Sequence, residues 1–295
     1  MTKDNTIGII VILGIVAIGL FGGTKGASKN GLLSNGNQSP EQKQKDIGQQ
    51  IQQTQRKVDD LKIKIQAEED RKTQSVYKNL VNLDYVNRST NPQQEYVLIR
   101  ISSNATTTIP VTGWILKSLN SGVSITIPKA TYLYFAGIPN TEDNIYLTGG
   151  DNLYLLTGIS PNGASFKANK CSGYLTQFQT FTPSINSNCP LPKDENLSSI
   201  PNRTINDACF DYINSFPRCR IQTETLPLKW STECQNFIYN KINYPTCINT
   251  HKNDKDFYQK DWRVYLKRSE PLWKDRRENI VLYDNLGKIV DTLKY

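Results

Sequence analysis

"ENIVLYDNLGKIVDTLKY", residues 278–295, is the segment of this 295-residue chain from which its architecture can be inferred. Apolar and polar residues alternate on both sides of a turn at 284–287, which predicts a β-hairpin. A two-stranded hairpin on its own is only marginally stable in water. The hairpin must therefore join a larger sheet, although the residues just before it do not have a strand pattern.

The rest of the sheet is expected earlier in the chain, because from Gln94 onward apolar residues recur at every second position. Short runs rich in Val, Ile, Thr and Tyr alternate with turn residues at 95–102, 104–118, 122–128, 131–137, 144–150 and 152–158. Short strands at this spacing are typical of an antiparallel sandwich. The C-terminal hairpin would supply the last two strands, which makes the residues between about 172 and 260 an insertion.

The stretch "EYVLIRISSNATTTIPVTGWILKS" (95–118) resembles the opening of a lamin tail domain, with an E-Y-V-x-I strand and a Gly-Trp-x-Leu strand. Residues 157–175 are similar to a segment of membrane-anchored lamin-tail proteins from small-genome bacteria. The end of the chain resembles the closing strand pair of that family at Leu282, Tyr283, Asp284, Gly287, Ile289, Val290, Asp291 and Tyr295. The resemblance implies an immunoglobulin-like sandwich with a binding or structural role and no catalytic residues.

The expected fold class is therefore an all-β immunoglobulin-like, lamin-tail-like sandwich with an inserted helical, disulfide-rich lobe. Residues 94–175 and 261–295 would form the sandwich, and residues 176–260 would form the lobe. Trp114 is expected to fill the space between the two sheets. Asp291 is expected to accept a hydrogen bond near the end of the last strand.

The cysteines gather in and beside the insertion, at Cys171, Cys189, Cys209, Cys219, Cys234 and Cys247. An even set without CxxC spacing or histidine partners favours disulfides over a metal site. Disulfides form in oxidising compartments, so this part of the chain is expected outside the cytoplasm.

Two helices are expected in the lobe, capped by Thr204 and Ser231 and ended by Pro217 and Pro245. Each helix then has one cysteine near its start and one just past its end. Antiparallel helices would favour the pairs Cys209–Cys247, Cys219–Cys234 and Cys171–Cys189. Six cysteines permit about fifteen pairings, so other connectivities stay open.

The N-terminal part of the chain predicts a membrane anchor. Residues 7–23 form a run without charged residues. The length of this run is close to the minimum for a helix that spans a membrane. A retained signal anchor over 1–24 is favoured over a cleaved signal peptide, because no clear cleavage site follows. Lys25 and Lys29 favour the opposite orientation, but the cysteines favour a single-pass protein of the cell membrane with extracellular C-terminal domains.

A flexible linker is expected at 25–41 and a coiled-coil stalk at 42–83. Apolar positions recur at alternating intervals of 4 and 3 residues, at Ile47, Ile51, Thr54, Val58, Leu61 and Ile65. This heptad spacing predicts a homo-oligomer, and a single solvated helix is the alternative. The helix is expected to continue through Val76 and Leu80.

The net charge of +8 predicts attraction to anionic surfaces such as phospholipid, wall polymer or nucleic acid. The candidate ligand-binding segment is 260–277, where basic and aromatic residues interleave. Its candidate residues are Lys260, Trp262, Arg263, Lys267, Arg268, Trp273, Lys274, Arg276 and Arg277. In the alternative interpretation this segment is a strand with Trp262, Val264 and Leu266 facing inward and the basic residues in water.

The sequence contains no enzyme signature. His251 is the only histidine, and "GISPNG" (158–163) departs from the G-x-S-x-G spacing of a nucleophile elbow. No cofactor or metal site is expected. The leading interpretation is a non-enzymatic cell-surface binding, adhesive or scaffolding protein, with a surface protein, a glycan or an anionic polymer as its partner. A nucleic-acid-binding module is the alternative, and a wall-modifying enzyme is a more distant one.

Overall fold

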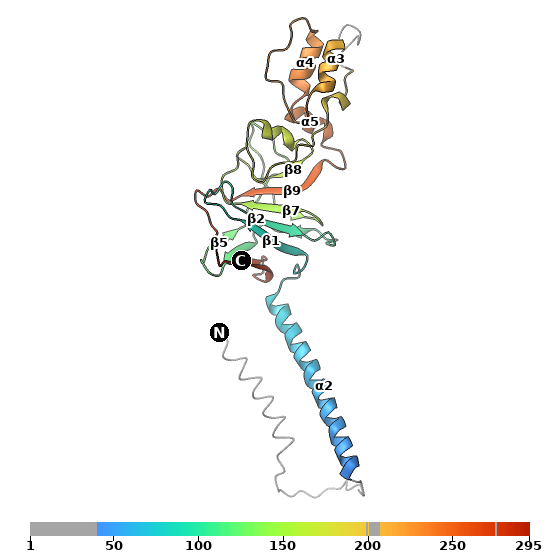
Figure 1. The fold of residues 1–295 in the computed structure, drawn as a ribbon, viewed down its shortest axis with the longest axis vertical. Coiled ribbons are helices and arrows are strands. Elements are labelled where there is room, and N and C mark those ends of the chain that lie inside the picture. Colours follow the sequence, from blue (N-terminus) through green and yellow to red (C-terminus); the bar gives the residue numbers. More distant parts are fainter. Residues whose placement is uncertain (1–39, 199, 201–206, 275) are drawn as a thin grey trace. The chain divides into compact units, whose positions relative to one another are not determined.

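The computed structural model describes residues 40–198, 200, 207–274 and 276–295 (Figure 1). The chain divides between Ile63 and Lys64 into two compact units. The uncharged run at 7–23 and nearly all of the expected linker lie outside the described residues. Within the described part of the chain, every helix is too short or too polar to cross a membrane.

Helix α2 (Pro40–Thr73) contains all the positions of the expected heptad seam. Its apolar side chains lie open to solvent, with Ile51 60% exposed and Leu61 56% exposed. The helix ends at Thr73, so the expectation that it continues through Val76 and Leu80 is wrong. Strand β1 (Val81–Asn87) follows instead, because Val81 and Leu83 alternate into the core of a sheet. Burial on that sheet outweighs a weak continuation of the heptad pattern.

A five-stranded sheet has the order β1-β2-β7-β9-β8. Its further strands are β2 (Tyr96–Ile101), β7 (Asn152–Leu156), β8 (Phe166–Asn169) and β9 (Tyr258–Tyr265). Strands β7 and β9 run parallel, whereas the other neighbours are antiparallel. The expectation of a purely antiparallel arrangement is therefore wrong. A parallel pair needs a long connection, and the segment between β8 and β9 provides one.

A four-stranded sheet has the order β11-β10-β4-β5, and β3 pairs with β6 in a separate two-stranded sheet. The bounds are β3 (Ile109–Pro110), β4 (Ile115–Ser118), β5 (Ser124–Thr126), β6 (Tyr146–Leu147), β10 (Asn279–Tyr283) and β11 (Ile289–Lys294).

The C-terminal hairpin joins the four-stranded sheet through β10, which pairs antiparallel with β4 so that Leu282 lies opposite Leu116. The expectation that 278–295 pairs with strands from 94–158 is therefore confirmed. The Asp284 carboxylate accepts hydrogen bonds from the backbone N–H groups of Leu286 (2.9 Å) and Lys288 (3.0 Å), which holds the turn. Gly287 supplies the positive φ of 71° that this turn requires.

The expected strand at 131–137 is not formed, and Thr131 makes only an isolated bridge to Phe166. The side chain of Asn140 satisfies the backbone here in place of a strand partner. Its carbonyl oxygen accepts from the Phe135 N–H (2.7 Å), and its amide donates to the carbonyl oxygens of Phe135 and Ile138. An asparagine can thus compete with the ladder for backbone groups.

The five-stranded sheet is buried on both faces. Val97, Ile99 and Trp262 share one core with Trp114, Leu116 and Leu282 of the other sheet. Tyr96, Leu98 and Phe166 belong to a second core that includes the cysteine-rich region. Trp114, at 1% exposure, therefore fills the space where both sheets meet, as expected. Asp291 accepts a hydrogen bond from the Leu83 N–H (2.7 Å), in the acceptor role expected for it.

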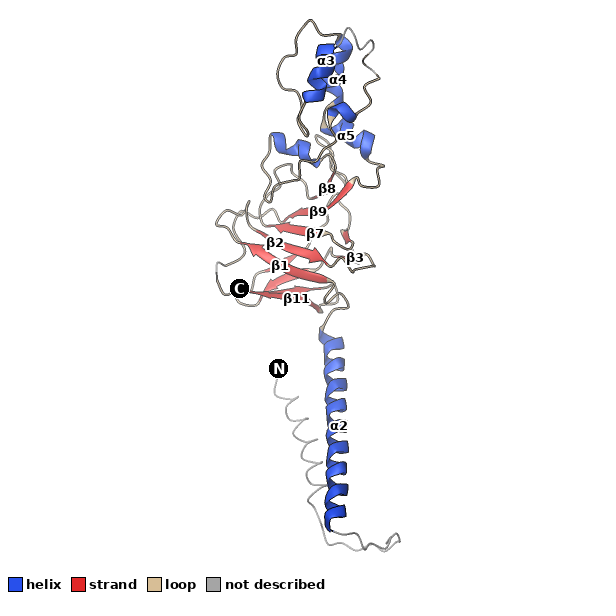
Figure 2. Ribbon diagram, turned by 45° about the vertical axis from the view of Figure 1, so that its right-hand side comes forward, coloured by secondary structure: helices blue, strands red, loops and turns tan. Residues whose placement is uncertain are grey.

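Helices α3 (Asp207–Ser215), α4 (Thr232–Lys241) and α5 (Tyr244–His251) lie beyond strand β8 (Figures 1 and 2). Two 3₁₀ turns, η1 (Ser172–Gln177) and η2 (Pro192–Asp194), precede them. The Ser231 hydroxyl caps α4 by accepting a hydrogen bond from the Cys234 N–H, as expected. The other expected cap, Thr204, lies outside the described residues.

We predict that Leu282→Ala destabilises the protein by about 3 kcal/mol, because Leu282 is fully buried and its truncation leaves a cavity. The matched control is Leu286→Ala in the adjacent turn, where Leu286 is 80% exposed, so an effect below about 0.5 kcal/mol is expected. Urea denaturation measures both values. Equal effects of the two substitutions would contradict the placement of β10 in the core.

Candidate functional site

All six cysteines form disulfides, and the pairs are Cys171–Cys247, Cys189–Cys219 and Cys209–Cys234. The expectation of disulfides is confirmed, but each of the three favoured pairs, Cys209–Cys247, Cys219–Cys234 and Cys171–Cys189, is wrong.

The predicted disulfide pairs are wrong because Pro245 was expected to end a helix. Pro245 instead stands in the first turn of α5, where its missing N–H costs nothing. The side chain of Asn243 caps α5 by accepting a hydrogen bond from the Thr246 N–H (2.9 Å). Cys247 is therefore inside a third helix and bonds to Cys171, and the Cys209–Cys234 disulfide joins the starts of α3 and α4.

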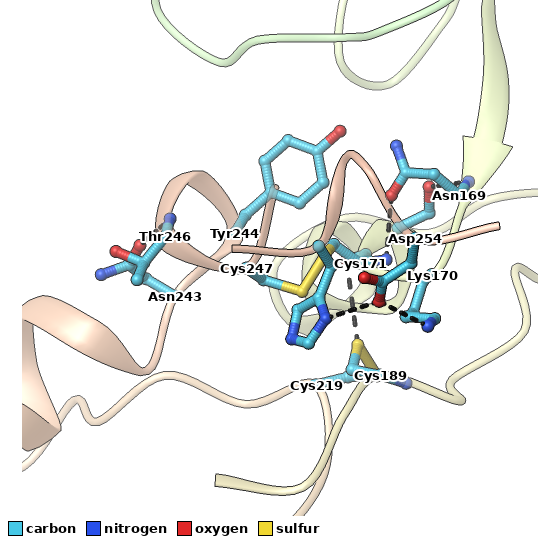
Figure 3. Close-up of a disulfide and its surroundings, with 12 residues drawn as sticks. Asn169, Lys170, Cys171, Cys189, Cys219, Asn243, Tyr244, Thr246, Cys247 and Asp254 are labelled. Carbon is cyan, nitrogen blue, oxygen red and sulfur yellow. Dashed lines mark hydrogen bonds and ion pairs between the residues drawn. A yellow bond between two sulfur atoms is a disulfide. The ribbon is translucent and has the colours of Figure 1, made fainter. Parts of the chain in front are cut away.

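A network of ion pairs lies beside the Cys171–Cys247 disulfide (Figure 3). Lys170 Nζ contacts the carboxylates of Asp254 (2.9 Å) and Asp256 (2.6 Å). His251 Nδ1 lies 2.8 Å from Asp254, and His251 Nε2 lies 2.9 Å from Glu195. The network therefore joins the end of β8, the end of η2, helix α5 and the approach to β9.

Both ring nitrogens of His251 face carboxylates, so the imidazole is positioned to carry a proton and not to take one from a nucleophile. Burial alone lowers the pKa of His251, but the hydrogen bonds to Glu195 and Asp254 outweigh it, and the net effect raises the pKa. The ammonium of Lys170 and then the His251 ring hold the pKa of Asp254 below its usual value. The network connects these four segments of the chain. Across the described residues no group of His, Cys, Asp and Glu side chains is arranged to hold a metal ion.

The aromatic residues of the candidate segment 260–277 are buried. Trp262 is 0% exposed and belongs to the core between the two sheets, as does Val264. Trp273 is 5% exposed in the same core. The inward alternation of Trp262 and Val264 is therefore confirmed, and Leu266, just past the end of β9, is half-buried against the same core. In this structure neither tryptophan ring is open to stack on a ligand.

Arg263 also faces inward, but toward the second core, contrary to the expectation that the basic residues all face water. Its guanidinium donates to the carbonyl oxygens of Pro183 and Ser184 and lies over the ring of Tyr154 at 5.5 Å. Burial lowers its pKa. Arg263 is therefore a structural connection between β9 and the 183–184 segment, since a buried guanidinium requires partners of this kind.

The other basic residues of the segment are exposed. Lys260 pairs with the buried carboxylate of Asp151 at 3.4 Å and donates to the Gly149 carbonyl oxygen. The remaining exposed basic residues are Lys267, Arg268, Lys274, Arg276 and Arg277. For these five, the described part of the chain contains no ion pair. They are the part of the predicted basic surface that a ligand can reach.

Two buried carboxylates hold the loop that carries these basic residues, and sequence reasoning missed both. Glu95, fully buried, accepts hydrogen bonds from the N–H groups of Leu272 (2.7 Å) and Trp273 (3.1 Å). Glu278 accepts from the Ser118 hydroxyl and the Lys274 N–H. These hydrogen bonds hold residues 272–274 of the segment between β9 and β10, whose described residues form no helix or strand.

A groove of about 560 Å³ was not anticipated from the sequence. The β1–β2 loop (91–94), the β7–β8 loop (159–161), residues 180–182 and Tyr265 line it. A second groove of about 390 Å³ lies on the other part of the β7–β8 loop, at 162–164, opposite residues 137–142. The polar residues around 89–94 are the only local hint of the first groove, because its walls come from segments far apart in the chain.

A comparison with protein-family models finds no match to this chain. A comparison with curated proteins likewise finds none.

We predict that the stability of the protein falls as the pH rises from 5.5 to 8.5. The pKa of His251 is higher in the folded state, so its stabilisation is complete below its unfolded pKa of about 6.5 and is lost as the pH rises through the folded pKa. A neutral ring donates only one N–H, so one of the two contacts between His251 and a carboxylate loses its donated hydrogen. Thermal unfolding measured across this range checks the trend.

The control is His251→Gln, because His251 is the only histidine in the chain. This variant should be less stable than the parent protein at pH 5.5, and its melting temperature should change much less between pH 5.5 and 8.5. An equally steep decline in both proteins would show that another group is responsible.

Proposed function

We propose that this protein is a non-enzymatic, membrane-anchored surface protein that self-associates through α2 and presents a disulfide-bonded, β-rich unit for binding. The observation that carries the proposal is the open apolar seam of α2. The uncharged run at 7–23 supports the anchor, and the three disulfides support an oxidising, extracellular setting for the C-terminal unit.

The seam favours a second copy of the same helix as its partner. Ile47, Ile51 and Leu61 are each more than half exposed, although they recur at the spacing of a heptad. Such a stripe is self-complementary, because the same positions on another copy form the matching surface. The other faces of α2 carry Gln, Lys, Asp and Glu, which suits a helix that contacts its partner along one narrow seam.

A lamin-tail-like, immunoglobulin-like sandwich is the fold we propose for the β-rich unit. Two features support it. The closing hairpin pairs with the strand that follows Trp114, and the two larger sheets contribute to one core. These features match the positions of the opening and closing motifs. The family resemblance also favours a binding or scaffolding role for the unit over a catalytic one.

The test of self-association compares seam and off-seam substitutions. Ile51→Glu and Leu61→Glu place charges in the seam, whereas Ile63→Glu places the same charge at a 68% exposed isoleucine outside it. Full-length protein in detergent is sized by light scattering coupled to gel filtration. The parent protein and Ile63→Glu should be oligomers, and the double seam variant should be a monomer at the same concentration.

Two results would contradict the proposal. If the parent protein is a monomer over the accessible concentration range, the seam does not bind a second copy of the chain. Dissociation by Ile63→Glu as strong as that by the seam variant would show that the heptad positions are not the contact surface.

A further inference from the structure

The first groove combines a moderate size with an uncharged, hydrogen-bonding surface. Its volume of about 560 Å³ lies in the range of small-molecule sites. Amides from Gln93 and Gln94 and hydroxyls from Thr180 and Thr182 line it. Ile159, 54% exposed, adds one apolar surface to the same groove. Amides and hydroxyls both donate and accept, so this lining suits a ligand with many hydroxyl groups.

The wall of the groove is held in place by its own contacts. The Gln93 side-chain oxygen accepts a hydrogen bond from the Ile159 N–H (3.0 Å). Gly158 allows this approach, since a Cβ atom there would lie 2.5 Å from the Gln93 oxygen. The Asn91 side chain accepts from the Gln93 N–H (3.0 Å). Two loops from different parts of the chain are therefore joined before any ligand arrives, which lowers the entropic cost of binding.

Two basic residues, Lys267 and Arg268, bond through their backbones to the residues just before Ile159 of the groove wall, and we call this pair the rim of the groove. The Lys267 N–H donates to the Gly158 carbonyl oxygen (3.0 Å), and the Arg268 N–H donates to the Thr157 carbonyl oxygen (2.9 Å). Lys267 has a φ of 57°, which is unfavourable for a residue with a side chain and is maintained here by these two bonds. Both basic side chains are exposed, next to the loop that forms the wall.

We infer that this groove binds an acidic polysaccharide, a class of ligand that deepens the binding role proposed above and rests on it. The amides and hydroxyls contact the sugar hydroxyls, Ile159 contacts a sugar ring, and Lys267 with Arg268 contacts a carboxylate or sulfate group. Nucleic acid fits the groove less well, because Trp262 and Trp273, the stacking residues of the segment, are buried.

The test measures binding of acidic hexasaccharides to the full-length protein by isothermal titration calorimetry. The probes are hexagalacturonate, a hyaluronan hexasaccharide and a heparin hexasaccharide, and fully methyl-esterified hexagalacturonate is the neutral counterpart of the first. At least one acidic probe should bind, and that affinity should fall with added salt. The methyl ester should bind more weakly than hexagalacturonate if hexagalacturonate is the probe that binds.

Three variants separate the parts of the site. Lys267→Gln with Arg268→Gln should weaken acidic binding about tenfold, since charge-assisted hydrogen bonds are lost. Thr180→Val should weaken it through the groove itself. Lys117→Gln removes the same charge from an exposed position on β4 of the other sheet and should leave binding unchanged.

The inference is overturned if none of the three acidic probes binds, or if the rim and groove variants bind like the parent protein. It is also overturned if a single-stranded oligothymidine binds more tightly than every saccharide and loses affinity in the same variants. The oligomeric state of each sample is measured in parallel. Loss of saccharide binding in an intact oligomer refutes the groove alone, whereas a monomeric parent protein refutes self-association.

Discussion

The central constraint on the β-rich unit is the second half of strand β9, residues 262–265, which is buried on both faces. Trp262 and Val264 face the core between the two sheets, and Arg263 and Tyr265 face the second core with the cysteine-rich region. A charged side chain tolerates that position only with hydrogen-bonding partners, which the carbonyl oxygens of Pro183 and Ser184 supply. The sheet and the inserted segment are therefore built around one strand.

Buried charged groups with hydrogen-bonding partners also position the exposed basic residues. Glu95 and Glu278 are buried carboxylates that accept backbone hydrogen bonds from the loop after β9. The described residues of that loop form no strand or helix, and Leu272 and Trp273 are its contribution to the core. Its exposed lysines and arginines are thus presented by a fixed backbone. A surface that looks like a simple run of charge in the sequence is positioned by polar groups inside the protein.

The two proposed activities use different residues. Self-association would use the seam of α2, and ligand binding would use the groove between the β1–β2 and β7–β8 loops. Several copies held on one membrane would raise the apparent affinity for a polymer with repeated sites, even when each groove binds weakly. A long polysaccharide is a ligand of that kind. The disulfides and the ion pairs of His251 would stabilise the binding unit outside the cell.

Elements with one buried face or a local signal could be predicted from the sequence alone. These include the hairpin at 278–295, the helical seam up to Ile65, the Ser231 cap and the inward alternation of Trp262 and Val264. Contacts between distant segments determine the rest, namely the disulfide pairing, the parallel pairing of β9, the burial of Arg263 and the groove. Periodicity records whether a side chain is buried, but not which distant segment buries it. In β9, alternation places Trp262 and Val264 inside but predicts a solvent-facing side chain at Arg263, which the second core buries.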